Sequence, residues 1–198
     1  MKYCKPNVVQ YMVLFFLINS SLSCQNKKIQ KKEVYLKSVI ENCLGKKLTI
    51  PDSLRIYAPF HDYLADSVLI SNAKYKIYSH ISASCPTCIR DIKLWNNIIP
   101  DFERFKVPVI LICGSSDNFE LFYYMYETGE INSFSYPFFL DIKDNYTKQN
   151  KFMKESQQFE TVLTDKENNI LLLGNPVRSK EMQYLYLKEI QKRIEQKK

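Results

Sequence analysis

The chain has 198 residues, 45% of them hydrophobic and 14% aromatic, so it can bury one good core but is too short for two sizeable domains. Its formal charge of +7 comes from 28 Lys and Arg against 21 Asp and Glu, with positive clusters over residues 27–32 and 188–198. A basic balance can indicate nucleic-acid binding, but clusters near the two ends are more typical of solvated segments close to an anionic membrane, so no nucleic-acid partner is predicted.

The first 23 residues have the pattern of a signal peptide. Lys2 and Lys5 supply a positive start, residues 11–18 an apolar core, and residues 19–23 a small polar end. The apolar core is too short to span a bilayer, which takes about 20 residues. The pattern therefore predicts export to a compartment in which disulfides persist.

Cys24 follows this segment directly, and its position resembles that of the lipobox cysteine of bacterial lipoproteins. A lipobox prefers Leu three residues before the cysteine, where this chain has Ser21. The resemblance implies that cleavage makes Cys24 the lipid-bearing N-terminus of the mature protein. The alternative is a secreted protein in which Cys24 carries no lipid.

Residues 24–46 are predicted to form a lipid-anchored tether and a short helix. The stretch 25–32 is polar and basic, as linkers are. Residues 33–44 carry apolar side chains at helical spacing and stop at Gly45, a residue that often ends helices. Cys43, in the last turn of this helix, is predicted to be a packing residue and not a second redox centre.

A single domain is predicted over residues 47–198. It begins with a β-hairpin in which residues 47–50 and 54–57 pair across the turn 51–53. Residues 60–70 fit no pattern well and are predicted to be a loop with a short strand.

The next stretch carries the chemistry. Residues 74–81 form an apolar run that is predicted to be the central strand, and Cys85 and Cys88 follow it at the start of an amphipathic helix. Pro86 suits the first helical turn, which places Cys85 at the helix N-terminus. The helix dipole and the free N–H groups there stabilise a thiolate, lowering the pKa of Cys85 from about 8.5 toward roughly 7 or below. Cys85 is the predicted attacking sulfur, and Cys88 the resolving thiol.

A zinc site and an inert structural disulfide are the alternatives for this motif. Zinc needs four ligands, usually from a second CxxC or a Cys/His pair, and neither Cys43 nor Cys113 has a partner at ligand spacing. His80 lies close to the motif in sequence, but a lone strand histidine is usually a structural group. No metal and no cofactor are therefore predicted.

The remaining elements alternate between strand and helix. The helix after the motif has a core-facing stripe at Ile89, Ile92, Trp95 and Ile99 and is predicted to end or kink at Pro100. The later predicted elements are a buried strand over residues 107–113 with Cys113 as inert core, a helix over 119–128 capped by Asp117 or Asn118, a strand over 134–141, an antiparallel hairpin of 160–165 with 170–174, and a last helix over 179–196 with Met182, Leu185, Leu187 and Ile190 on its apolar side.

A strand, a CPxC motif and a helix in this order resemble the thioredoxin superfamily, and most of all its TlpA/ResA-type membrane-tethered branch, over about residues 47–198. The resemblance implies an α/β fold, a thioredoxin-like three-layer sandwich with an N-terminal helix and β-hairpin extension. It also implies that an acidic residue three positions after the second cysteine, here Asp91, handles the proton of Cys88. A solvated helix carboxylate is the alternative for Asp91.

The chain departs from that family at two positions. Ser84 stands where the family usually has Trp, and Phe159 stands where it has a cis-proline at the start of the strand before the final hairpin. A cis bond before a residue other than proline costs about 2.5–4 kcal/mol, so the Gln158–Phe159 bond is predicted to be trans and the peptide groove reshaped. We expect a narrow substrate range and weak turnover of generic disulfides such as insulin.

The predicted function is extracytoplasmic thiol–disulfide exchange with protein thiols or disulfides, by an enzyme anchored through lipid to a bacterial membrane, with its domain facing the periplasm. One alternative is a peroxiredoxin-like peroxide reductase, in which Tyr78 and Ser82 occupy the positions of the usual Pro and Thr. The other is a non-catalytic lipoprotein whose CxxC is a structural staple. Neither the direction of electron flow nor the oligomeric state follows from the sequence.

Overall fold

The computed structural model describes residues 30–61, 63–64 and 67–196. The predicted signal peptide, the predicted lipidation site Cys24 and the first part of the tether lie outside these residues. The chain divides into two compact units, Met1–Glu41 and Asn42–Lys198. Residues 30–43 are helical, which confirms the helix predicted over residues 33–44. No helix in the described part of the chain is both long and apolar enough to cross a membrane.

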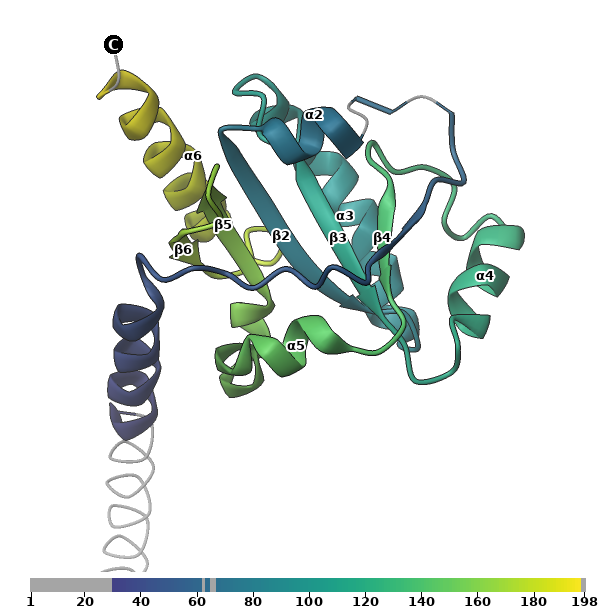
Figure 1. The fold of residues 1–198 in the computed structure, drawn as a ribbon, viewed down its shortest axis with the longest axis horizontal. Coiled ribbons are helices and arrows are strands. Elements are labelled where there is room, and N and C mark those ends of the chain that lie inside the picture. Colours follow the sequence, from purple (N-terminus) through teal and green to yellow (C-terminus); the bar gives the residue numbers. More distant parts are fainter. Residues whose placement is uncertain (1–29, 62, 65–66, 197–198) are drawn as a thin grey trace, which may run out of the picture. The chain divides into compact units, whose positions relative to one another are not determined.

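A mixed sheet of six strands forms the centre of the second unit (Figure 1). The strands are β1 (Arg55–Tyr57), β2 (Tyr75–Ser82), β3 (Val109–Gly114), β4 (Phe138–Asp141), β5 (Thr161–Asp165) and β6 (Ile170–Leu173). Their order is β1-β4-β3-β2-β5-β6, with β2, β3 and β4 parallel and β1, β5 and β6 antiparallel to the strands they join. The predicted central strand, the buried strand after it and the final hairpin are confirmed.

Helices cover both faces of this sheet. They are α2 (Ser67–Asn72), α3 (Pro86–Glu103), α4 (Glu120–Glu127), α5 (Asn145–Gln149) and α6 (Lys180–Glu195), with the 3-10 helices η1 (Lys151–Glu155) and η2 (Gln157–Glu160). α3 and α6 share one face, where the rings of Phe102 and Tyr186 meet at 6.3 Å between centroids. α5 lies on the other face (Figure 1), where Tyr146 is fully buried. These three layers, with the CxxC between the central strand and its helix, are the thioredoxin-like fold.

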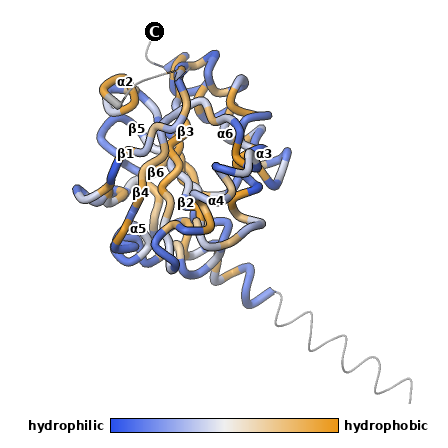
Figure 2. Tube along the Cα trace, turned by 90° about the vertical axis from the view of Figure 1, so that its right-hand side faces the viewer, coloured by the Kyte–Doolittle hydropathy of each residue, from blue (hydrophilic) through white to orange (hydrophobic). Residues whose placement is uncertain are grey.

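The core lies between the sheet and α3. Ile89, Ile92, Trp95 and Ile99 of α3 are each 1% exposed, which confirms the predicted stripe, and Phe102 extends it. All six residues of β3 are buried, as expected for a parallel strand covered on both faces. Figure 2 shows hydrophobic residues concentrated along the strands. The site-bearing helix is therefore held by packing along most of its length.

The predicted N-terminal hairpin is wrong. Lys47 forms a bridge with Asn169, and the Leu48 N–H donates to the Asn168 carbonyl at 2.8 Å, so this segment joins the turn between β5 and β6. The second half of the predicted hairpin is β1, in which Arg55 pairs with Leu140 of β4. Pairing with segments distant in sequence is favoured over the local hairpin because it buries Leu48, which is only 1% exposed, and covers the edge of β4.

Four further predictions need correction. The stretch expected to hold a short strand forms the helix α2, although Val68 in it is 62% exposed. Of the two outcomes predicted at Pro100, the end of the helix is wrong, because α3 continues to Glu103 and the buried Phe102 anchors its last turn. The strand predicted over residues 134–141 is restricted to β4. In α6, Leu185 is 44% exposed, and Tyr186 and Ile190 face the core.

Candidate redox site

The two cysteines of the CPTC motif lie at the junction of β2 and α3, joined as a disulfide with 5.3 Å between their Cα atoms. Cys85 is the N-cap of α3, with an extended backbone at φ −122° and ψ 110°, and Pro86 begins the helix. The Sγ atom of Cys85 accepts a hydrogen bond from the N–H of Cys88 at 3.4 Å. The predicted position of Cys85 at a helix N-terminus is confirmed.

The surroundings of the disulfide leave its sulfurs within reach of a partner. Cys85 and Cys88 are half-buried, while Pro86 and Thr87 between them are exposed. The Thr87 hydroxyl lies 3.2 Å from the Cys85 Sγ. When the pair is reduced, the first N–H groups of α3 and this hydroxyl can donate to a thiolate at Cys85, which stabilises the ionised form.

Ser84 ties the motif to the loop that follows β3. Its hydroxyl donates to the Asp117 carboxylate at 2.7 Å and accepts from the Ser116 N–H at 2.8 Å. The Ser115 hydroxyl donates to the same carboxylate oxygen at 2.6 Å. These hydrogen bonds, that from Ser115 first and that from Ser84 second, hold the pKa of Asp117 below its usual range. A polar network therefore occupies the position before the first cysteine, where the resembled family usually has Trp.

The sequence pattern indicated Asp117 or Asn118 only as the cap of the following helix. The N-cap of α4 is Phe119, and Asp117 accepts from the Leu121 N–H in the first turn at 3.3 Å. Its bond to Ser84 joins residues 33 positions apart, a separation that no local pattern reveals. One signal was present in the predicted topology. The carboxyl ends of adjacent parallel strands share one edge of a sheet, so the segments that follow β2 and β3 had to come together there.

Asp91 lies one helical turn after Cys88 on α3, as its spacing predicted. Its carboxylate accepts a hydrogen bond from the guanidinium of Arg178, in the loop between β6 and α6. The Arg178 side chain is 59% exposed, and surface ion pairs of this kind are worth about 0–1 kcal/mol. The pair orients Asp91 without locking it. Because Arg178 is 87 positions away, no spacing in the sequence indicated it.

The other described cysteines are far less suited to redox chemistry. Cys43 and Cys113 are free and buried, as predicted for packing residues. Burial raises the pKa of Cys43, and it raises the pKa of Cys113 to about 12. Within residues 30–61, 63–64 and 67–196, no group of three His, Cys, Asp or Glu residues could hold a metal ion.

Phe159 lies in η2, the short helix immediately before β5. The resemblance to the thioredoxin superfamily implied a proline at this position. Its ring is 3% exposed, and its N–H donates to the Ser156 carbonyl at 2.9 Å. No peptide bond among the described residues is cis, so the Gln158–Phe159 bond is trans. The segment is therefore a short helical turn with a buried aromatic ring.

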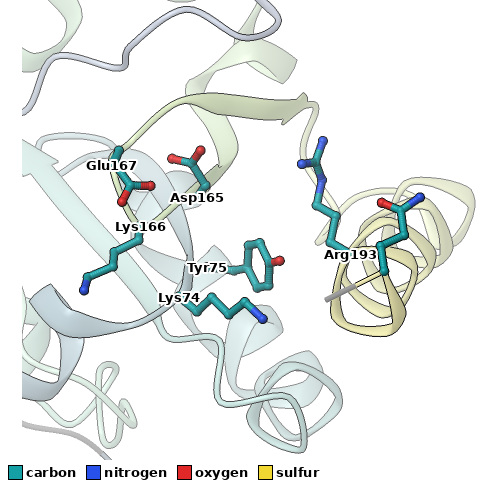
Figure 3. A pocket seen from close by; sticks show the side chains of 7 residues that line it. Lys74, Tyr75, Asp165, Lys166, Glu167 and Arg193 are labelled. Atoms are coloured by element: carbon teal, nitrogen blue, oxygen red, sulfur yellow. The ribbon is translucent and has the colours of Figure 1, made fainter. Parts of the chain in front are cut away.

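A polar pocket of about 360 Å³ lies at the opposite end of β2 (Figure 3). It is lined by Lys74 and Tyr75, by the turn residues Asp165 to Glu167, and by Arg193 of α6. The eight residues of β2 span roughly 25 Å between this pocket and the CPTC motif. The pocket is therefore separate from the thiol site.

Comparisons with protein-family models and with curated proteins find no match to this chain. Among solved structures, the chain is similar to a thioredoxin-like protein from Bacteroides caccae ATCC 43185, with 20% identity and a TM-score of 0.44 over 82% of this chain and 55% of that one. It is also similar to a putative thiol:disulfide interchange protein DsbE from Chlorobium tepidum, with 11% identity and a TM-score of 0.46 over 73% of this chain and 96% of that one.

The reduced N-terminal domain of PilB from N. meningitidis is a third similar structure, with 13% identity and a TM-score of 0.45 over 62% of this chain and 84% of that domain. This chain spans only about half the length of the B. caccae protein. All three TM-scores are below 0.5, so these likenesses carry no argument about activity. The fold assignment rests on the order of the strands and on the place of the disulfide between β2 and α3.

Proposed function

We propose that this protein is a thiol–disulfide oxidoreductase that works outside the cytoplasm, anchored to a bacterial membrane by a lipid on Cys24. One observation carries the redox part of the proposal. The Cys85–Cys88 disulfide lies at the N-terminus of an 18-residue helix, at the end of the central strand of a thioredoxin-like sheet, and both cysteines are half-buried. The export and the anchor rest on the sequence pattern of residues 1–24.

The exchange runs in two displacements. The thiolate of reduced Cys85 attacks one sulfur of a partner disulfide, which forms a mixed disulfide and releases one partner thiolate. The thiolate of Cys88 then attacks the Cys85 sulfur, which closes the Cys85–Cys88 bond and releases the second partner thiolate. The dithiol gives up two electrons and the partner gains two thiols; the reverse sequence oxidises the partner. Asp91 takes the proton from Cys88 before the second step.

Capture of partners by Cys88→Ala is the experiment that tests this function. Without the resolving thiol, mixed disulfides should accumulate through Cys85 in cells and disappear on reduction. Cys113→Ala is the matched control, because that thiol is fully buried and should leave capture unchanged. The proposal fails if Cys88→Ala captures nothing, or if the adducts persist when Cys85→Ser is added.

A redox titration distinguishes exchange from a structural staple. An exchanging pair should have a potential of about −270 to −180 mV, whereas a structural bond lies below roughly −300 mV. The titration follows the fraction of Cys85–Cys88 disulfide in glutathione buffers. A value below that window would return the CPTC motif to the non-catalytic alternative.

Asp91→Asn should slow closure of the mixed disulfide at neutral pH by roughly 10²-fold, the lower range of general-base effects. The reason is that the amide cannot accept the Cys88 proton, so the pH at which closure becomes fast should move upward. Stopped-flow resolution of a preformed mixed disulfide across pH 5–9 measures it. Arg178→Gln is the control, since it removes the partner of Asp91 and keeps the carboxylate. An unaltered pH profile would make Asp91 a surface carboxylate.

Cys24→Ala should abolish incorporation of labelled fatty acid into the full-length protein expressed in bacteria, because it removes the only predicted lipid acceptor. Cys4→Ala is the matched control, since Cys4 lies in the segment predicted to be cleaved off. Gel detection of the label gives the result. Equal labelling of Cys24→Ala and of the unmodified protein would contradict the anchor and leave the redox proposal standing.

A further inference from the structure

His80, on β2 and five residues before Cys85, faces the side of the sheet opposite α3. Its side chain is 11% exposed. Both ring nitrogens are shielded from solvent, and neither has a hydrogen-bond partner among the residues that the structure describes. Shielded polar atoms without hydrogen-bond partners are unfavourable. We therefore looked for groups near the ring with which its nitrogens could form hydrogen bonds.

Two carboxylates face the two nitrogens from separate segments of the chain. Nδ1 lies 3.9 Å from Oε2 of Glu160, the last residue of η2. Nε2 lies 3.9 Å from Oδ1 of Asp144, the residue before α5. Gly114 of β3 leaves the room for this approach, since a Cβ there would lie 2.8 Å from Nε2 and 3.0 Å from the Asp144 oxygen. The ring sits between two acids, just beyond hydrogen-bond distance of both.

The protonation state of the ring decides how many of these acids it can bind. A neutral imidazole has one N–H and one lone pair, so it can donate to one carboxylate and must turn its lone pair toward the other. A doubly protonated ring donates to both, and charge-assisted bonds of this kind close to about 2.8 Å. Only the imidazolium form of His80 can therefore join Glu160 and Asp144.

Other charged and titratable groups lie on the same face. Asp141 of β4 pairs in register with Gly114 and is fully buried; one of its oxygens accepts from the Tyr146 N–H at 2.6 Å, and the other has no described partner. The remaining neighbours are phenols: Tyr146 itself, and Tyr78, which donates to the Asn168 side chain. The charges from the residue before α5, from β4 and from η2 are thus all acidic, and the basic group of α5, Lys148, is exposed and donates to the Lys143 carbonyl at 2.6 Å.

The segment that Glu160 belongs to borders the thiol site. β5 begins at Thr161, which pairs with Ser79 of β2, so η2 runs beside the last residues of β2. Those residues lead directly to Cys85, and the Cys85 N–H donates to the Ser82 carbonyl at 3.3 Å. Movement of η2 therefore changes the wall of the site that a partner disulfide meets.

We propose that protonated His80 bridges Glu160 and Asp144 and so holds η2 in place beside the dithiol, as a positioning residue for partner binding. Loss of one proton frees one of the two acids and loosens η2. The bridge follows from the contacts of the ring alone. Its effect on partner binding rests on the proposed function, and the two are tested by different measurements.

Imidazole NMR tests the bridge directly. The chain has two histidines, so His61→Gln leaves the NMR signal of His80 alone. His61 is an exposed residue. The NMR signals follow the loss of the second ring proton as the pH rises. Glu160→Gln and Asp144→Asn, added singly, should each move the midpoint of this loss to lower pH. A midpoint that neither change moves would overturn the bridge.

Hydrogen exchange over residues 156–161 tests whether the bridge holds η2. After correction for intrinsic rates, protection in the unmodified protein should be roughly tenfold greater at pH 5.5 than at pH 8.5, the effect of one charge-assisted hydrogen bond. His80→Gln should remove this difference, and His61→Gln should keep it. Should His80→Gln fail to fold, Glu160→Gln makes the same test at a partly exposed side chain. Equal protection at both pH values in the unmodified protein would overturn the proposal.

Steady-state reduction of insulin separates the bridge from the redox function. At pH 5.5, His80→Gln should raise KM for insulin roughly tenfold with kcat unchanged, while His61→Gln changes neither. A lower kcat with unchanged KM would overturn the positioning role. A bridge seen by NMR in a protein whose Cys88→Ala variant captures no partner would instead count against the proposed function.

Discussion

In the reduced protein at pH 7, Cys85 should react with iodoacetamide on the order of 10⁴ times faster than Cys113. Only the thiolate reacts, and the two sulfurs differ in how easily they ionise. Burial raises the pKa of Cys113 to about 12, so about one molecule in 10⁵ carries that thiolate at pH 7. Cys85 lies at the N-terminus of α3, where a cysteine is expected to ionise near neutrality. Cys88, one turn further in, should react more slowly than Cys85.

Timed alkylation followed by peptide mass spectrometry measures these rates. Labelling of Cys113, which is fully buried, should stay far below that of Cys85 over the whole range from pH 7 to pH 9. Labelling of Cys85 should level off over the same range. Cys85→Ser is the control, in which only the slow phases remain. Equal rates at Cys85 and Cys88 would contradict the assignment of the attacking sulfur.

Trp95→Ala should lower the free energy of unfolding by about 3–5 kcal/mol, the range for removing a large buried ring. Trp95 is 1% exposed and lies on the inner face of α3 between Ile92 and Ile99. Its removal leaves a cavity beneath the helix that carries the disulfide. The melting temperature should fall by roughly 6–20 °C for a domain of this size.

Leu94→Ala is the matched control for this change. Leu94 is the preceding residue of the same helix, but it is 44% exposed, so its truncation should cost about 1 kcal/mol or less. Urea unfolding of the oxidised proteins, followed by circular dichroism, compares the two without relying on the fluorescence of the only tryptophan. Equal destabilisation by Trp95→Ala and Leu94→Ala would show that α3 is not anchored through its inner face.

The parts of the fold that could be predicted are those whose causes are local. Pro86 marks the first turn of α3, apolar spacing marks its inner face, and an unbroken apolar run marks β3. These features place Cys85 at a helix N-terminus from a stretch of some thirty residues. The prediction that Cys85 lies at the N-terminus of a helix was therefore right.

The parts that could not be predicted depend on partners far along the chain. Lys47 and Leu48 have strand-like composition, but their hydrogen bonds go to the turn between β5 and β6, which a local hairpin pattern cannot show. The contacts of Ser84 with Asp117 and of Asp91 with Arg178 also join segments far apart in the sequence, so no local pattern shows them. Once the strand order is known, the contact of Ser84 with Asp117 follows from it. The contact of Asp91 with Arg178 depends on where a side chain points.

The sulfur of Cys85 is also the group that caps α3. It accepts the Cys88 N–H, the bond that serine or threonine hydroxyls provide at most helix starts and that is worth about 1 kcal/mol. In the proposed exchange, a mixed disulfide at Cys85 would draw this acceptor toward the partner, so helix initiation and turnover would compete for one atom. Serine at position 85 keeps an acceptor there and removes the chemistry, while alanine removes both. The difference in unfolding free energy between Cys85→Ser and Cys85→Ala therefore measures how much a capping acceptor at position 85 stabilises α3.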